Sequence, residues 1–379
     1  MRIVLEAVFW VCAGLLFVHY VGYPAVLAVL PARRRRQEEP APGGWPVVSV
    51  LIAARNEEKV IGARLDNIRS QNYPGTIEIL VGSDASTDAT DAIVAARAGE
   101  GVTLVRSETR SGKPRIIQML ARRARGQVFV FTDADTVFVP DTVRELVAPL
   151  GDPSVGCVDG SRRNSLSTET CESAYWKYEK WIKGLCSRLG AVLGATGAVF
   201  SLRREAFMPL SEDRADDFEL AVMARIAVYD CIFAPGAVAM EPAPDDKAQY
   251  RRLVRIVSWM STSCMKLAWK AVSAGRPLIA LQLFVHKVLR WKTGFMVLAA
   301  TAAAGLLWHP WPYAAAFSLL MLFHLAAAAG AASHGGLPGK MLFPYYFWLM
   351  NSASMAGLLR ALGRRPVETW ERKKAAGSP

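Results

Sequence analysis

A run of apolar residues at the start of the chain constrains its fold more than any other feature. Residues Ile3 to Leu30 contain one charged side chain, Glu6, and are followed by the cluster Arg33 to Arg36. At a rise of about 1.5 Å per residue this run can cross the hydrocarbon core of a bilayer. Because positive clusters mark the cytoplasmic side, the sequence predicts a transmembrane helix over residues 1–32 and a cytosolic domain after it. A cleaved signal peptide is the alternative, but the run is long for one and the arginines lie on its wrong side.

The composition leaves room for one soluble domain beside the membrane segments. The chain has 379 residues, 52% of them hydrophobic, which is enough for an α/β domain of ordinary size with apolar segments to spare. Its net charge of +12 sits largely beside hydrophobic segments. Membrane orientation explains that placement better than nucleic-acid binding does, so we expect no nucleic-acid partner.

Cysteine and histidine usage excludes several kinds of site. The six cysteines form no CxxC pair, so neither a disulfide framework nor a zinc site is indicated. No histidine lies between Pro31 and Val285. A Ser-His-Asp triad or a histidine-based metal site is therefore excluded from the soluble domain.

Short apolar runs alternate with helical stretches over residues 45–245. The predicted strands, apolar on both faces as in a parallel sheet, are Val47–Ala54, Ile77–Gly82, Val102–Val105 and Val128–Thr132. The predicted helices between them are Glu57–Ser70, Asp88–Ala98 and Lys113–Arg123. This order predicts a doubly wound α/β domain.

The C-terminal part is expected to lie on and in the membrane. Residues 246–292 are predicted as amphipathic interfacial helices, although packing on the soluble domain would explain the same pattern. Residues 293–332 are predicted as a transmembrane hairpin, 341–362 as a third apolar segment, either transmembrane or re-entrant, and 363–379 as a basic cytosolic tail. Entry of Leu278–Leu289 into the bilayer would change the number of crossings.

The motif Asp133-Ala134-Asp135 follows the last of the predicted strands directly. Ligands of open α/β sheets gather at the carboxyl ends of the strands, so both carboxylates are expected in the crevice there. Two hard oxygen ligands suit Mg²⁺ or Mn²⁺ holding a diphosphate. A bare DxD also arises by chance and in helix caps, and its position at a strand end is what favours a metal site here.

Other polar residues follow the neighbouring strands. Asp84 comes after the second strand, and Glu57 comes after the first. Helix capping is the ordinary interpretation of such residues, but Asp88 can cap the next helix while Asp84 faces a ligand. Three polar strand ends together favour a nucleotide pocket.

No phosphate-binding glycine loop of the Walker or GxGxxG type is present. Phosphate charge must then be met by a metal and by basic side chains. The candidates are Lys113, Arg251, Arg252 and Arg255.

The acidic pair Asp216-Asp217 opens an apolar-periodic segment. Acids at a helix start usually stabilise the helix dipole. Deprotonation of a substrate hydroxyl, however, needs a base, and without histidine a carboxylate is the candidate. Adjacent like charges would raise the pKa of one of the two and improve its basicity.

Taken in order, these motifs resemble the family 2 glycosyltransferases of the GT-A fold, especially the membrane-integrated branch with the cellulose and hyaluronan synthases. The match runs from about Val47 to Arg255. The motifs that carry it are Ala54-Arg55-Asn56-Glu57-Glu58, Ser83 to Asp88, Gly112-Lys113, Asp133-Ala134-Asp135, Gly194 to Ala198, Asp216-Asp217 and Gln249-Tyr250-Arg251-Arg252.

The resemblance implies a Rossmann-like mixed sheet and a set of roles. Glu57, Asp84, Lys113, Asp133 and Arg252 would bind the donor, and Asp135, with Asp133 assisting, would hold the metal. Asp217 would be the catalytic base. The remaining residues, which would shape the acceptor site or close it, are Gly197, Asp216, Gln249 and Trp259.

Two departures from the family pattern bear on the product. Asp216 replaces a glutamate and keeps the charge, whereas Leu253 stands where the QxxRW motif has tryptophan. Loss of that stacking ring puts processive synthesis in doubt, unless Trp259 substitutes for it.

The expected activity is inverting transfer from a nucleotide-sugar, expected to be a UDP-sugar, to a saccharide acceptor in polysaccharide or glycoconjugate synthesis. The expected location is the inner membrane, crossed several times, with the catalytic domain in the cytosol. A homo-oligomer or an export partner is a further candidate partner, and dimerisation would supply the additional spans that a polymer channel needs. The alternatives are transfer to a polyprenyl phosphate, which yields a lipid-linked sugar, a two-metal nucleotidyltransferase and a non-enzymatic membrane scaffold.

Overall fold

The computed structural model describes residues 1–35, 44–164, 172–210, 216–241, 246–333 and 339–363. The chain forms two compact units. The sheet unit comprises residues 33–165, 190–242 and 366–379, and the helical unit comprises residues 1–32, 166–189 and 243–365. Residues 166–189 thus interrupt the predicted range 45–245, and most of the predicted basic tail lies outside the described residues.

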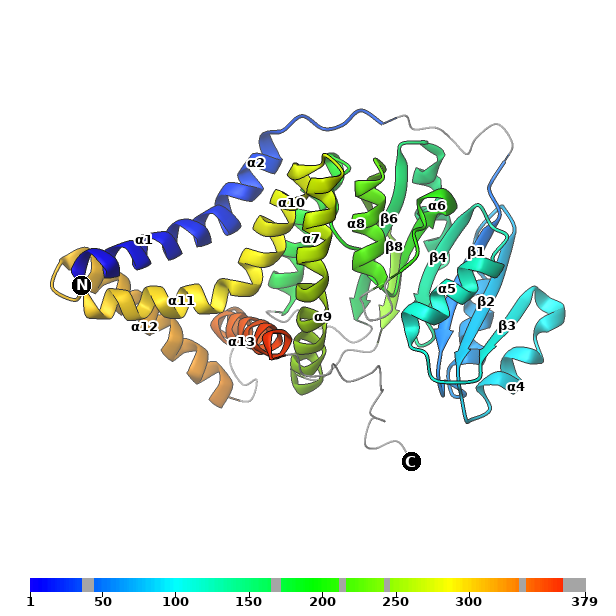
Figure 1. Ribbon diagram of the computed structural model, residues 1–379. Helices are drawn as coiled ribbons and strands as arrows, with labels where there is room; N and C mark the ends of the chain where they lie inside the picture. Colours follow the sequence, from blue (N-terminus) through cyan, green and yellow to red (C-terminus); the bar gives the residue numbers. More distant parts are fainter. Residues whose placement is uncertain (36–43, 165–171, 211–215, 242–245, 334–338, 364–379) are drawn as a thin grey trace. The chain divides into compact units, whose positions relative to one another are not determined.

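An eight-stranded mixed sheet forms the centre of the sheet unit (Figure 1). Its strand order is β3-β2-β1-β4-β7-β6-β8-β5, with β1 to β4 parallel to one another and β7 antiparallel to both of its neighbours. The strands are β1 (Val48–Ala54), β2 (Ile77–Asp84), β3 (Val102–Ser107), β4 (Val128–Asp133), β5 (Val137–Phe138), β6 (Val155–Asn164), β7 (Phe200–Arg203) and β8 (Asp230–Glu241).

The predicted parallel half of the sheet is confirmed. All seven residues of β1 are buried, because β1 lies between β2 and β4 and is covered on both faces. The remaining strands extend the sheet and make it mixed.

The helices of this unit are α3 (Ile61–Arg69), α4 (Thr90–Ala95), α5 (Lys113–Arg123), α6 (Thr142–Val147) and α8 (Asp216–Ile226), and its 3₁₀ turns are η2 (Ala98–Glu100), η3 (Ala148–Gly151) and η4 (Arg204–Ala206).

A close contact between β2 and α5 sets the position of the strand end. A Cβ built on Gly82 would lie 2.2 Å from Cγ2 of Ile116, so only glycine lets the helix come this near. Ile116 and Leu120 are fully buried there. The start of α5, with Lys113, is thereby held beside the carboxyl end of the sheet.

The linker after the first helix is tied to the sheet unit by its arginines. The Arg33 guanidinium forms an ion pair with Asp230, and Nε of Arg35 lies 3.8 Å from the same carboxylate. Asp230 begins β8 and its side chain is 2% exposed. Two members of the predicted membrane-side arginine cluster therefore also anchor the polypeptide to a strand.

The described residues of the second unit form helices joined by short non-helical segments. Its helices are α1 (Arg2–Phe17), α2 (Tyr23–Val29), α7 (Glu172–Arg188), α9 (Asp246–Ser273), α10 (Pro277–Leu283), α11 (Leu289–Leu306), α12 (Trp311–Ala332) and α13 (Phe343–Leu362). Two π-helical turns, η1 (Val18–Gly22) and η5 (Phe284–Val288), and the 3₁₀ turn η6 (Gly339–Leu342) complete it.

Two helices among the described residues have the length and apolar composition needed to cross a membrane. They are the continuous helix Arg2–Val29 and α12. Few residues of either helix are buried in the structure. The range 246–292, predicted as amphipathic helices, begins with α9, which runs from Asp246 to Ser273.

Candidate functional site

The carboxyl ends of three neighbouring strands lie level with one another. In the register of the sheet Ala53 of β1 pairs with Asp133 of β4, and Ala54 pairs with Ser83 of β2. Asp133 and Asp84 are the last residues of their strands. The structure thus brings the predicted strand-end carboxylates to one edge of the sheet.

The Asp133-Ala134-Asp135 motif leaves β4 at this edge. Ala134 is buried, whereas the side chains of Asp133 and Asp135 are partly exposed. Nζ of Lys113, at the start of α5, lies 2.8 Å from Oδ1 of Asp133. Lys113 and the motif, predicted separately, are therefore in direct contact.

A buried arginine supports the motif from inside the domain. Arg64 of α3 is 2% exposed, and its Nη2 donates a hydrogen bond of 2.7 Å to Oγ1 of Thr132, the residue before Asp133. Burial lowers the pKa of Arg64 to about 9, although the negative charges of Asp133 and Asp135 act in the opposite direction. Arg64 is therefore a cation at neutral pH.

The residues at the motif fit a metal that is held jointly with a substrate. The described residues contain no group of three or more His, Cys, Asp or Glu side chains able to hold an ion by themselves. Mg²⁺ and similar ions commonly take one or two carboxylates and complete their coordination with substrate phosphates and water. The two partly exposed carboxylates Asp133 and Asp135 match that mode.

The loops after β1 and β2 are held together by polar contacts. Oδ1 of Asn56 accepts a hydrogen bond of 2.8 Å from the backbone N of Thr87, and Oγ1 of Thr90 accepts one of 2.8 Å from the backbone N of Glu57. Asn56 and Ala85 have φ values of 54° and 53°. Left-handed backbone at a non-glycine residue is strained and persists where surrounding contacts fix it, as happens at ligand sites. Glu57 is buried at this junction, 6% exposed.

Asp84 binds the loop that leads into α5. Its Oδ1 accepts a hydrogen bond of 2.6 Å from the backbone N of Ser111, and its Oδ2 accepts one of 3.1 Å from the backbone N of Gly112. Gly112 has φ 82°, a conformation that glycine adopts without strain. Asp84 thus shapes the loop that presents Lys113, and its predicted contact with the nucleobase stays a prediction.

The predicted base lies against the predicted acceptor loop. A Cβ built on Gly197 would lie 2.9 Å from Oδ2 of Asp217, so the absence of a side chain at Gly197 gives this carboxylate its place. Oδ1 of Asp217 accepts a hydrogen bond of 2.8 Å from the backbone N of Phe218. Asp216 begins α8, and its side chain lies outside the described residues.

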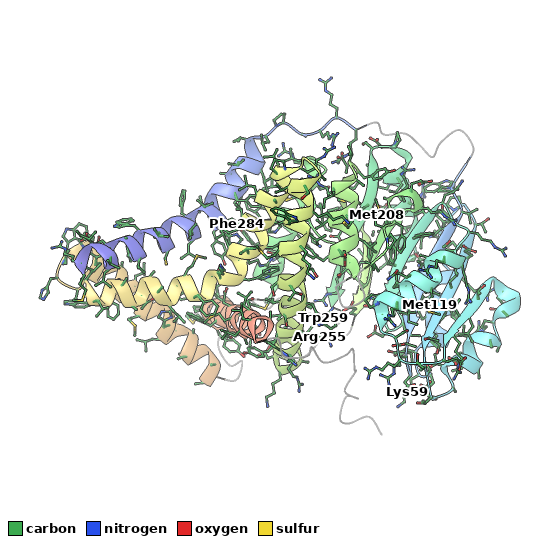
Figure 2. The ribbon with its side chains drawn as sticks, in the orientation of Figure 1. Lys59, Met119, Met208, Arg255, Trp259 and Phe284 are labelled. Atoms are coloured by element: carbon green, nitrogen blue, oxygen red, sulfur yellow. The ribbon has the colours of Figure 1, made fainter. Side chains whose placement is uncertain are left out.

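The remaining predicted site residues lie on α9 of the helical unit. Gln249 and Arg252 are three residues apart and share a face of the helix. Further along, the Arg255 guanidinium carbon lies 5.5 Å from the centre of the Trp259 ring (Figure 2). Their predicted roles beside donor and acceptor stay predictions.

Arg64 and Thr132 adjoin the motif and were not among the predicted site residues. Arg64 occupies a core position of α3, on the buried face formed by Ile61, Leu65 and Ile68. A charged residue at an apolar position of an amphipathic helix is the signal that could have identified it.

Comparison with known proteins shows a similarity to glycosyltransferases. Residues 49–210 match the model of Glycosyl transferase family 2. Curated relatives include an N-acetylglucosaminyltransferase of Rhizobium sp. (strain N33), 26% identical over 64% of this chain and 58% of the relative. A Beta-monoglucosyldiacylglycerol synthase of Nostoc sp. is 27% identical over 55% of this chain and 48% of the relative. The chain thus spans about half to three fifths of the length of these relatives.

A solved structure has the same fold over nearly the whole chain. It is a mannosyltransferase from Pyrobaculum calidifontis in complex with GDP-Man and Mn²⁺, 24% identical, with a TM-score of 0.69. The alignment covers 95% of this chain and 98% of the mannosyltransferase. Residues 49–210 of the chain therefore resemble family 2 glycosyltransferases in sequence, and the chain shares its fold with the solved mannosyltransferase.

Proposed function

We propose that the chain is an inverting glycosyltransferase that moves a sugar from a nucleotide-sugar, a UDP-sugar in the first instance, to a saccharide acceptor. One observation carries the proposal: Asp84 and Asp133 both end their strands at the carboxyl edge of the sheet, and Lys113 forms an ion pair with Asp133 there. A nucleoside diphosphate carries several negative charges, and this edge offers a cation and a pair of ion-binding carboxylates to receive them.

The acceptor hydroxyl is activated by Asp217 in this proposal. The Asp217 carboxylate takes the proton as the hydroxyl oxygen forms a bond to the anomeric carbon, and the bond from that carbon to the diphosphate oxygen breaks with its electron pair on the leaving group. Attack from the face opposite the leaving group inverts the anomeric centre. Gly197 leaves room for the carboxylate.

Asp133 and Asp135 hold the divalent ion, Mg²⁺ or Mn²⁺, in this proposal. When bound, such an ion neutralises charge on the diphosphate leaving group. Lys113 keeps Asp133 oriented at the edge of the sheet through their 2.8 Å ion pair.

We also propose that the protein resides in the inner membrane with the sheet unit in the cytosol. The apolar helices Arg2–Val29 and Trp311–Ala332 support attachment, and Arg33 and Arg35 follow the first of them as expected for the cytoplasmic side. A lipid-linked acceptor is the second candidate, because it would meet the enzyme at this surface. The name of the Nostoc relative, a glucosyldiacylglycerol synthase, favours it.

Sugar transfer from labelled donors tests the proposal. Detergent-solubilised protein would be incubated with Mn²⁺, UDP- or GDP-sugars labelled in the sugar, and either oligosaccharides or a membrane lipid extract. Label in an oligosaccharide with inverted anomeric configuration by NMR supports the saccharide acceptor, and label in the organic phase supports the lipid. Label found only in free sugar or intact donor would contradict transferase activity.

A further inference from the structure

Arg64 is bound into the structure from several sides. Its Nη1 donates to Oδ1 of Asn67, and its guanidinium carbon lies 4.1 Å from the centre of the Phe138 ring. The Asn67 side chain is itself fixed by two hydrogen bonds to the backbone of Phe138, of 2.8 and 2.9 Å. These contacts join α3 to β5, so the guanidinium has little freedom to move away from the segment that carries the DxD motif.

A buried charge of this kind is costly unless it meets charges of opposite sign. The negative charges of Asp133 and Asp135 favour the charged form of Arg64, and Lys113 forms an ion pair with Asp133. The motif's two carboxylates are thus accompanied by two cations. One of these cations, Arg64, lies inside the domain where solvent screens it poorly.

The positive charge of Arg64 has opposite effects on the binding of a divalent ion alone and on the binding of the ion together with a diphosphate. A divalent ion alone adds positive charge beside the fixed cation Arg64, and the repulsion weakens its binding. A nucleoside diphosphate arriving with the ion adds about three negative charges, so the same cation then favours the assembled group. Such a difference is a coupling between two ligands, and it is reciprocal.

We propose that Arg64 is a positioning residue that couples metal binding to diphosphate binding by acting through Asp133, Asp135 and Thr132. The proposal rests on the proposed function. In this proposal the positive charge of Arg64 weakens binding of the divalent ion to the DxD motif while the donor is absent. The ion and the nucleotide therefore bind together.

Binding of Mn²⁺ tests this without measuring turnover. The free Mn²⁺ signal in electron paramagnetic resonance gives its dissociation constant for detergent-solubilised protein alone, with UDP and with GDP. In the wild type one nucleotide should tighten Mn²⁺ binding at least about tenfold. In Arg64→Met, Mn²⁺ alone should bind about tenfold more tightly, and the enhancement by nucleotide should shrink.

Two further variants separate charge from packing. Arg64→Lys keeps the positive charge and should keep most of the coupling. Arg69→Met removes an exposed arginine of the same helix, one that pairs with Glu100, and should leave both Mn²⁺ constants unchanged. Thermal melting shows which variants are folded.

The outcomes distinguish this inference from the proposed function. A wild type that binds no Mn²⁺ with either nucleotide would overturn the proposed function itself. Normal coupling in folded Arg64→Met would overturn only the role of Arg64, as would loss of coupling in folded Arg64→Lys. If Arg64→Met does not fold, a wild type that binds Mn²⁺ equally well with and without nucleotide still contradicts the inference.

Discussion

Gly197 lies against the carboxylate of Asp217, a residue twenty positions later in the chain. Replacing Asp217 by Asn keeps the shape of the side chain and removes its basicity. We expect kcat to fall by about 10² to 10⁴, the usual contribution of a general base, with donor binding retained. Glu205→Gln, an exposed acid on η4, is the matched control. Near-normal turnover of Asp217→Asn would refute the assignment of the base.

Gly197→Ala tests the position of the same carboxylate. The new Cβ would lie 2.9 Å from Oδ2 of Asp217, and the carboxylate must move to relieve the contact. Because small displacements of catalytic groups are costly, we expect kcat to fall by about 10- to 100-fold with little change in melting temperature. Gly62→Ala is the control, since its Cβ would meet only an ordinary contact at 3.7 Å. An equal loss of activity in both variants would count against a specific role for Gly197.

At the scale of single residues, strand-end carboxylates could be predicted but their supporting contacts could not. Asp133 and Asp84 are visible because apolar strands precede them, and their proximity follows from parallel pairing. Arg64 reaches Thr132 from a helix 68 residues earlier in the chain, and only the packing of α3 on the sheet brings the two together. Its position between apolar residues was the available signal.

Among the elements, Asp88 lies two residues before α4; it was expected to cap that helix, but the N-cap position is occupied by Ala89. Oδ1 of Asp88 accepts a hydrogen bond of 3.0 Å from the backbone N of Thr90, and Oδ2 accepts one of 3.2 Å from the backbone N of Glu58. Partial burial alone would raise the pKa of Asp88, but hydrogen bonds from Thr90 and the backbone lower it below its ordinary value.

Asp88→Ala should therefore destabilise the protein by about 1 kcal/mol at pH 7. Since the folded-state pKa lies below the unfolded one, this contribution is present above the unfolded value, near 3.8, and is lost as the pH falls through the folded value. Thermal melting of wild type and Asp88→Ala at pH 7 and near pH 3 measures this contribution. Glu108→Ala is the control, because the Glu108 side chain is 84% exposed. If the difference in melting temperature between wild type and Asp88→Ala increased on acidification, this account would be contradicted.

Strands β5 to β8, half of the sheet, were not predicted from the sequence. Strands β1 to β4 have apolar runs and were predicted. β8 contains Pro235 and Gly236, and β6 carries polar residues and shifts register against β8 between Asp159 and Ser161. Proline, glycine and irregular pairing remove the continuous apolar pattern on which strand prediction depends.

For the whole molecule, the apolar helix α12 gives a test of membrane attachment. Leu319 and Leu322 are 69% and 64% exposed. Exchanging both for Arg should cost about 2.5 to 3.5 kcal/mol each on insertion, so less protein should stay in membranes after alkaline carbonate extraction. The double alanine variant is the control. Full extraction of the wild type by carbonate would contradict membrane integration.

The sequence predicted the placement of the strand-end carboxylates better than the organisation of the whole chain. Arg33 and Arg35 illustrate the difference, because a cluster predicted to orient the membrane helix also binds Asp230 of β8. That second partner lies nearly 200 residues away and follows only from the folded sheet.

Release of nucleoside diphosphate tests the central claim most directly. Purified protein would be given Mn²⁺ and a panel of UDP- and GDP-sugars, in parallel with Asp135→Asn and with Asp66→Asn, an exposed acid of α3 paired with Arg97. Our account predicts release by the wild type and by Asp66→Asn, abolished by EDTA and reduced at least about 10²-fold in Asp135→Asn. Release that persists in EDTA or in folded Asp135→Asn would contradict a metal-dependent transferase at this motif.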